Sequence, residues 1–351
     1  MPMPIPLRTR QALLGPILLA ALALAGCDRD TPDTETLNFF AFGTIVDITL
    51  YPAGAYDLEA LESELQAELE ILHTSWHAWE PGSLGRTNEL LALQAEFSAP
   101  PSVLPLIERG KEMEALSDGL FNPALGKLVA AWGFHQDEPE GPPPDAETLE
   151  ALLEDPPSMR DIERNGVRLR GQHADLQLDF GGLAKGLAVE RMLDLLQNQG
   201  VEAAIFNAGG DLMTLGRPAD RAWQVAIRHP QGGILGSIEL DAVEALFSSG
   251  DYERGYEWEG EHIHHVIDPR TGRPSEGVHG ATVLHSDPAL ADAAATTLMI
   301  AGPEEWPHYA RKMGIEAALV VLDDRIEATP AMAERVRMED DQPALEERGL
   351  P

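Results

Sequence analysis

Apolar and polar residues recur at two spacings along the chain, and each spacing predicts one kind of element. Alternation with a period of two, typical of half-buried strands, occurs in the runs 44–50, 174–178, 223–228 and 234–240. Leucines at 58, 61, 65, 69 and 72 form an apolar stripe that predicts a core-facing helix over 58–72. Helical spacing also predicts helices over 103–117, 187–199 and 290–300, and apolar runs predict buried strands at 203–206, 281–284 and 314–322. We therefore expect a mixed α/β fold, in which the proline-rich and acidic segment 138–155 is a surface excursion.

A glycine turn separates the expected strand 174–178 from the helix that follows it. The segment reads Leu-Asp-Phe-Gly-Gly-Leu-Ala-Lys-Gly from Leu178 to Gly186. Gly181 and Gly182 let a ligand approach the backbone closely, and the free N–H groups of a helix N-terminus favour an anion. A phosphate beside Lys185 is one interpretation of this segment, and a tight turn with a surface lysine is the other.

A second glycine pair follows the strand 203–206, so two glycine loops could meet on one ligand. Its residues are Asn207, Gly209, Gly210 and Asp211. Trp76 and Trp79 lie in a polar loop after the first helix, where they either stack on an aromatic ligand or pin the loop to the core.

The segment 262–272 is dense in groups that perform chemistry. It holds His262, His264 and His265, followed by the turn that begins at Asp268. Three histidines suggest zinc, but neighbouring residues of a strand point to opposite faces, so His264 and His265 cannot both face one site. A single histidine that acts as a base or a phosphate ligand is the favoured interpretation.

Asp292 and Thr296 are four residues apart on an expected helix and therefore share one face. A carboxylate and a hydroxyl so placed suit a hard cation such as Mg²⁺. The alternative is an aspartate that interacts only with the helix dipole.

The N-terminus carries a targeting signal. Arg8 and Arg10 precede an apolar run over 12–25 that is too short for an ordinary membrane span. The run ends in Leu-Ala-Gly followed by Cys27, which resembles a bacterial lipobox, with an ordinary secretory signal or an anchor helix as the alternative. We expect Cys27 to carry lipid and Asp28 to favour retention at the inner membrane. Because Cys27 is the only cysteine, the mature chain is expected to have no disulfide.

The chain has a formal charge of −34 over 351 residues. We therefore expect no nucleic-acid partner, because binding to a phosphate backbone needs clustered Lys and Arg. An anionic ligand would have to be held locally, by glycine loops, single cations or a bound metal.

Together these stretches resemble the ApbE-type FAD:protein FMN transferases, over about residues 42–321. The resemblance rests on several blocks in the family's order rather than on one motif. Three residues depart from the family's pattern. The family usually has Asp at the position of Asn122, and it more often has Tyr and Asp at the positions of Leu187 and Glu190. The matching blocks are 42–44, 79–88, 119–123 with 132–134, 179–186, 207–211, 249–254, 264–272 and 292–296.

The resemblance implies a single layered α/β domain related to the T-fold, which follows a lipoprotein signal peptide. We expect the signal peptide at 1–26, an acidic tether at 27–37, the catalytic domain at 38–325 and a charged tail at 326–351. It also implies that FAD is the substrate and that Mg²⁺ is held by Asp292, Thr296 and the carbonyl of Ala184. The expected FAD contacts are Thr44, Trp79, Gly181, Gly182, Lys185, Asn207, Gly209, Gly210, Asp211 and Asp251.

The reaction implied is attack by a Thr or Ser hydroxyl of a partner protein on the FMN phosphorus, with release of AMP. His265 matches the family's catalytic histidine, with Asp268 or His264 as the alternative base and Lys185 near the phosphates. The implied partners are membrane redox proteins such as subunits of NADH:quinone reductase, and the implied location is the periplasmic side of the inner membrane. An FAD pyrophosphatase and a flavin-binding lipoprotein without chemistry remain alternatives from the sequence.

Overall fold

The computed structural model describes residues 33–351. The signal peptide, Cys27 and most of the expected tether lie outside the described residues. No helix within residues 33–351 combines the length and the hydropathy that a membrane span needs.

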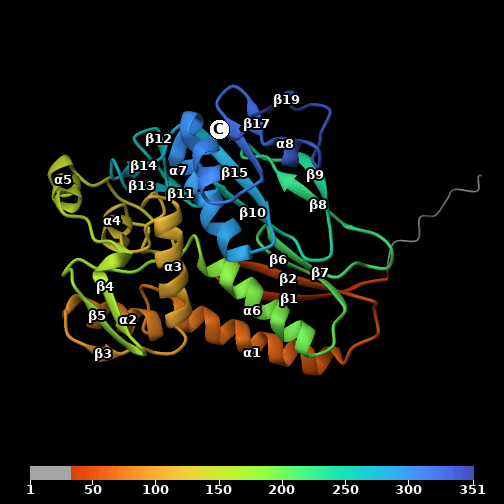
Figure 1. Ribbon diagram of the computed structural model, residues 1–351, viewed down its shortest axis with the longest axis horizontal. Helices are drawn as coiled ribbons and strands as arrows, with labels where there is room; N and C mark the ends of the chain where they lie inside the picture. The colour runs from red at the N-terminus through yellow and green to blue at the C-terminus, as the bar shows by residue number, and fades with distance from the viewer. Residues whose placement is uncertain (1–32) are drawn as a thin grey trace, which may run out of the picture. The chain divides into compact units, whose positions relative to one another are not determined.

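A nine-stranded sheet forms the centre of the molecule (Figure 1). Neighbouring strands are antiparallel throughout, except for the parallel pair β17 and β19 at one edge. The order across the sheet is β1 (Glu35–Ala41), β2 (Thr44–Tyr51), β6 (Ala203–Ala208), β7 (Asp211–Leu215), β10 (Ala245–Gly250), β15 (Val278–His285), β16 (Ala317–Leu322), β17 (Ile326–Ala328) and β19 (Leu345–Glu347).

Alternate residues of these strands face opposite sides, and each side is covered by a different layer. On β6, Ala204 and Phe206 join the larger core while Ala203 joins a second core on the other side. The larger core is covered by α1 (Leu58–Trp76), α6 (Ala184–Asn198) and α7 (Pro288–Lys312), and the second by β8 (Trp223–Arg228), β9 (Ile234–Leu240), α8 (Pro330–Ala333) and β18 (Arg337–Met338).

Smaller elements lie to one side of the central sheet, at the left of Figure 1. They include a three-stranded sheet and two short hairpins. The remaining elements are α2 (Ser83–Ala92), β3 (Phe97–Ser98), α3 (Leu104–Leu116), α4 (Gly126–Ala131), α5 (Ala146–Glu154), the 3₁₀ turn η1 (Met159–Asp161), β4 (Ile162–Asn165), β5 (Arg168–Gly171), β11 (Gly255–Trp258), β12 (Glu261–His264), β13 (Ile267–Asp268) and β14 (Arg273–Pro274).

Both expected ends of the domain are wrong. The tether was expected to reach residue 37, but β1 starts at Glu35 and pairs along its whole length with β2. The expected tail over 326–351 instead adds β17 and β19 to the central sheet, and β18 to β9. Its Ile326, Ala328 and Met332 are buried in the second core, so a high density of charges concealed a few apolar residues that complete the sheet.

The strand expected over 174–178 is also wrong. Its alternation is real, but only one isolated bridge, from Gln177 to Leu125, has strand geometry. The Asn88 side chain accepts from the Leu178 N–H at 2.8 Å and donates to the Leu178 carbonyl at 3.0 Å. A side chain therefore satisfies the backbone groups that a neighbouring strand would otherwise pair.

Candidate functional site

The glycine turn is fixed to the tryptophan loop by one carboxylate. Asp179 accepts from the Gly181 N–H at 2.9 Å through Oδ1 and from the Trp79 indole N–H at 3.1 Å through Oδ2. Trp79 is half-buried, and its ring lies 5.7 Å from that of His135. The turn and the loop, 100 residues apart in sequence, therefore form one surface.

Lys185 leaves the first turn of α6 and pairs with the carboxylate of Asp211 at the start of β7. Asp211 is 3% exposed, and its Oδ1 accepts from the Ser248 N–H of β10 at 3.0 Å. The predicted meeting of the two glycine loops is therefore found in the structure, with an ion pair between them.

The carboxylate of Asp292 approaches the same helix turn from α7. Its Oδ2 accepts from the Gly186 N–H at 2.9 Å, and only 3% of the residue is exposed. Thr296, one turn along α7, has its hydroxyl 3.1 Å from that of Ser249. A Cβ on Gly182 would lie 2.9 Å from the Thr296 hydroxyl, so the glycine turn touches α7 as well.

These groups carry mutually dependent charges. Burial raises the pKa of Asp292 to about 7, and the positive charge of Lys185 opposes that shift. Burial alone would lower the pKa of Lys185, but the charges of Asp211, Glu253 and Asp292 outweigh it and the pKa is raised. Lys185 therefore stays protonated within an acidic group.

The oxygen set around Asp292 fits a hard cation. The Oδ2 of the buried carboxylate accepts from one N–H, and the Thr296 hydroxyl, one turn further along α7, lies 3.1 Å from that of Ser249. Ala184 begins the same helix turn as Gly186. Oxygen donors with a single buried charge suit Mg²⁺ better than zinc. Within the described residues no group of three or more His, Cys, Asp or Glu side chains is arranged to hold a metal ion.

His265 has a defined tautomer. Its Nδ1 lies 3.1 Å from the carbonyl of Arg254, which can only accept, so Nδ1 carries the proton and Nε2 has a free lone pair. Burial lowers the pKa of His265 to about 4, and the charges of His264, Arg254 and Lys185 act in the same direction. The imidazole is therefore neutral near pH 7 and can accept a proton at Nε2.

The two alternative bases are engaged elsewhere. Asp268 is 7% exposed and makes a bidentate pair with the Arg270 guanidinium, with its oxygens 2.8 to 3.1 Å from Nε and Nη2. His264 has Nε2 2.9 Å from the Ser275 carbonyl, and its Nδ1 accepts from the Val266 N–H at 3.4 Å. Both ring nitrogens of His264 are thus in use, and the geometry favours His265.

The second glycine loop lies against the turn between β1 and β2. Gly209 has φ +68°, and a Cβ there would lie only 2.5 Å from the Thr44 hydroxyl. Asn207 closes the loop by accepting from the Gly210 N–H at 2.8 Å. Thr44, Asn207, Gly209 and Gly210 therefore lie together, next to Asp211, which pairs with Lys185.

Asp251 is less available than the sequence suggested. Its Oδ2 lies 2.6 Å from His279 Nδ1, and its carbonyl lies 2.9 Å from His262 Nε2. Sequence reasoning also missed the parts played by Asn88, Asp179 and Ser249, each of which acts through a contact between distant segments. Only the order of the family's blocks hinted at them.

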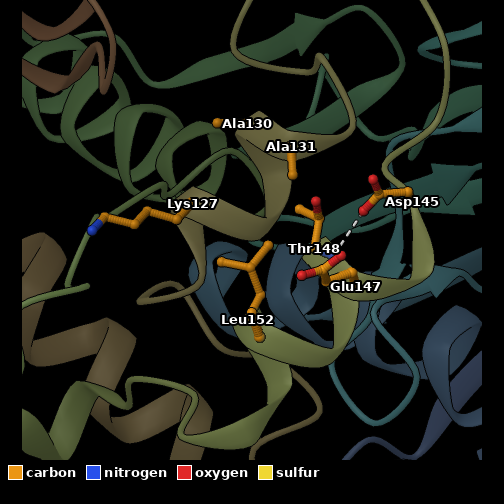
Figure 2. Close-up of a pocket in the computed structure, with 8 residues that line it drawn as sticks. Lys127, Ala130, Ala131, Asp145, Glu147, Thr148 and Leu152 are labelled. Carbon is orange, nitrogen blue, oxygen red and sulfur yellow. Dashed lines mark hydrogen bonds between the residues drawn. The ribbon is translucent and has the colours of Figure 1, made fainter.

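A hollow of about 620 Å³ between α4 and α5 contains none of these residues (Figure 2). Lys127 points away from Asp145 in Figure 2 and pairs with Asp175 instead. Small and apolar side chains make up much of the remaining lining, so polar groups do not converge there.

Comparisons with known proteins identify the family of the chain. The sequence model of the ApbE family matches residues 42–319, which is more than half of the chain. The chain belongs to the ApbE family. The resemblance seen in the sequence and the expected mixed α/β fold are thereby confirmed.

Three ApbE relatives show the extent of the similarity. FAD:protein FMN transferase of Rhodobacter capsulatus is 38% identical over 92% of this chain, which spans 62% of that relative's length. FAD:protein FMN transferase of Treponema pallidum is 32% identical over 73% of this chain and 77% of its own. The crystal structure of Pseudomonas stutzeri flavinyl transferase ApbE, in the apo form, is 30% identical with a TM-score of 0.76, over 86% of this chain and 96% of its own.

Proposed function

We propose that the chain transfers the FMN moiety of FAD to a Thr or Ser hydroxyl of an acceptor protein, with release of AMP and dependence on Mg²⁺. The observation that carries the proposal is the position of Lys185 in the first turn of α6, where it pairs with Asp211 and directly precedes Gly186, whose N–H donates to Asp292. The charge of Lys185 also acts on Asp292 and His265, because it lowers the pKa of both. In the proposal, Lys185 binds an anion, the Asp292 carboxylate binds a metal and the neutral His265 imidazole accepts a proton. The names of the ApbE relatives support the same activity.

For this reaction the protein must position the pyrophosphate and the acceptor hydroxyl, neutralise charge on the transferred phosphoryl group and supply a proton acceptor. Lys185 has three N–H donors, of which Asp211 takes one, so the others can reach the pyrophosphate. His265 Nε2 takes the proton of the acceptor hydroxyl while the hydroxyl oxygen forms a bond to the FMN phosphorus. The bond between the FMN phosphorus and the bridging oxygen of the pyrophosphate then breaks, and AMP leaves with the bridging oxygen.

Asp292, Thr296 and the Ala184 carbonyl would hold Mg²⁺. When bound, the ion would neutralise charge on the phosphoryl oxygens. The contact between Gly186 and Asp292 keeps the carboxylate against the turn on which Ala184 lies.

The acceptor and the location follow from the sequence rather than from the fold. We include in the proposal a lipid on Cys27, a position on the periplasmic side of the inner membrane, and membrane redox subunits such as those of NADH:quinone reductase as acceptors. The apolar run before Cys27 and the Leu-Ala-Gly-Cys motif support the anchor.

The test uses the protein from Asp28 onward, FAD, Mg²⁺ and an acceptor domain that carries the target Thr, beside a Thr→Ala acceptor. In-gel flavin fluorescence after denaturation and the mass of the acceptor report covalent FMN. We expect an adduct that a chelator abolishes. His265→Ala should still bind FAD but lose about 100-fold or more in transfer, whereas His308→Ala, at an exposed histidine, should not change it.

Other outcomes would change the conclusion. Free FMN and AMP without an adduct would indicate a pyrophosphatase, and bound FAD without turnover would indicate a flavin-binding protein. Unchanged transfer by His265→Ala would remove His265 from the role of base.

A further inference from the structure

The loop that follows β10 is held from two sides at Asp251. The Asp251 N–H donates to the His279 carbonyl at 3.1 Å, and the Asp251 carboxylate lies 2.6 Å from His279 Nδ1. The Asp251 carbonyl lies 2.9 Å from Nε2 of His262 on β12. These contacts fix the start of the loop between β15 and β12.

His279 lies between two carboxylates. Its Nδ1 faces Asp251, and its Nε2 is 2.8 Å from Oδ1 of Asp323, which follows β16. Ionised carboxylates only accept hydrogen bonds, and a neutral imidazole has one N–H whereas an imidazolium has two. Both contacts can therefore be hydrogen bonds only while His279 is protonated.

The loop ends at Arg254, three residues after Asp251, and there it meets the proposed base. The Arg254 carbonyl accepts from the backbone N–H of His265 and from its Nδ1–H, each at 3.1 Å. The position of this carbonyl sets the tautomer of His265 and the direction of Nε2. A shift of the loop would therefore turn the base away from the acceptor hydroxyl.

We propose that His279 is a positioning residue for flavin transfer, which acts through Asp251 and Arg254 to orient His265 and does so only in its protonated form. The inference rests on the proposed function of His265 as base. The side-chain hydrogen bonds of His279 are with Asp251 and Asp323.

The charges around His279 are consistent with this role. Burial alone would lower the pKa of His279, but the hydrogen bonds and charges of Asp251 and Asp323 outweigh it, and the pKa is raised. His264 on β12 also faces this group, and its pKa is lowered by burial, so it stays neutral. His262 contacts the Asp251 carbonyl and the Glu257 carboxylate, and these hydrogen bonds raise its pKa.

The expected result is an alkaline limb in the rate of transfer. As pH rises through the raised pKa of His279, its imidazole loses one N–H proton. A nitrogen lone pair of His279 then faces a carboxylate, and the loop from Asp251 to Arg254 loosens. His265 is already neutral above about pH 4, so its own titration does not produce this limb. The effect belongs to kcat rather than to the KM for FAD, because orientation of the base is what changes.

The experiment measures kcat and KM for FAD from pH 6 to 10 in the full chain and in its variants. In His279→Gln, we expect kcat to fall about tenfold at pH 7 and the alkaline limb to vanish. A tenfold loss is smaller than the roughly 100-fold loss that a misplacement of 1 Å can cause. His173→Gln is the matched control, because His173 also contacts an aspartate, Asp155, at 3.3 Å but on a segment remote from the loop. It should keep both the rate and the limb.

A direct titration keeps the inference testable if His279→Gln fails to fold. Nuclear magnetic resonance of the imidazole nitrogens should give His279 a pKa above the ordinary 6.5 or so, and the pKa should fall in Asp323→Asn, at a mostly exposed position. A wild-type limb retained in His279→Gln, or an ordinary pKa, would overturn the inference. A wild-type chain that flavinylates no acceptor would refute the proposed function instead, while the titration would still decide whether the two carboxylates hold His279 protonated.

Discussion

Replacement of Gly186 by Ala should disable the site although it adds only one methyl group. A Cβ at this position would lie 2.5 Å from the Pro288 carbonyl oxygen and 2.7 Å from the Ala289 Cα, both of them backbone atoms of α7. Ordinary contacts begin near 3.4 Å, so α6 and α7 must separate by about 0.9 Å, the difference between 3.4 and 2.5 Å. Alanine favours the helix by about 1 kcal/mol, but overpacking costs about 1–3 kcal/mol and cannot be relieved by a rotamer change.

The separation also acts on the chemistry. The Gly186 N–H bonds to Asp292, so a shift of this size moves the carboxylate relative to Lys185. We expect Gly186→Ala to lose about 1 kcal/mol or more in urea unfolding and about 100-fold in flavin transfer. Gly349→Ala, where a Cβ has nothing within 4 Å, is the control. A Gly186→Ala protein as stable and as active as the wild type would refute the reasoning about this contact.

Three further predictions concern the metal, the base and the C-terminus. Asp292→Asn keeps the shape of the side chain but removes its charge, and we expect transfer to fall more than about 100-fold at every Mg²⁺ concentration in a metal titration; a normal Mg²⁺ response would exclude Asp292 as a ligand. Because the folded-state pKa of His265 is lowered to about 4, its contribution to stability is present above about pH 6.5 and is lost as pH falls towards 4, by up to about 3 kcal/mol. Urea unfolding at several pH values should show a weaker dependence in His265→Gln, and an unchanged dependence would contradict the shift. Deletion of 326–351 should abolish cooperative unfolding monitored by circular dichroism, because it strips buried apolar residues from the second core; a two-state transition in the shortened chain would show that the segment is dispensable.

Periodicity predicted most of the large elements because their apolar faces lie directly on the sheet. The leucine stripe over 58–72 became α1, and the run 44–50 became β2. The strand predicted over 174–178 failed because a side chain, that of Asn88, occupies its backbone groups. The local sequence pattern around Leu178 does not indicate that its hydrogen-bond partner, Asn88, lies 90 residues away in the sequence.

The sequence named the residues of the candidate site but not their arrangement in space. The sequence indicated Lys185, Asp292 and His265, yet it left His264 and Asp268 open as the base. Only coordinates show that the Arg270 guanidinium engages Asp268 and that the Ser275 carbonyl and the Val266 N–H occupy the nitrogens of His264. Such assignments depend on what the other side of each group contacts, which spacing along the chain does not encode.

The nine strands of the central sheet pair in the order in which they occur along the chain. No strand has to enter between two that are already paired, so a chain emerging from its N-terminus can extend the sheet one strand at a time. The ligand site does not share this gradual assembly, because Asp292 and Thr296 lie on α7, after six of the nine strands. A growing chain therefore acquires six strands of its sheet before Asp292 and Thr296 emerge, so the proposed flavin site is completed only after Thr296.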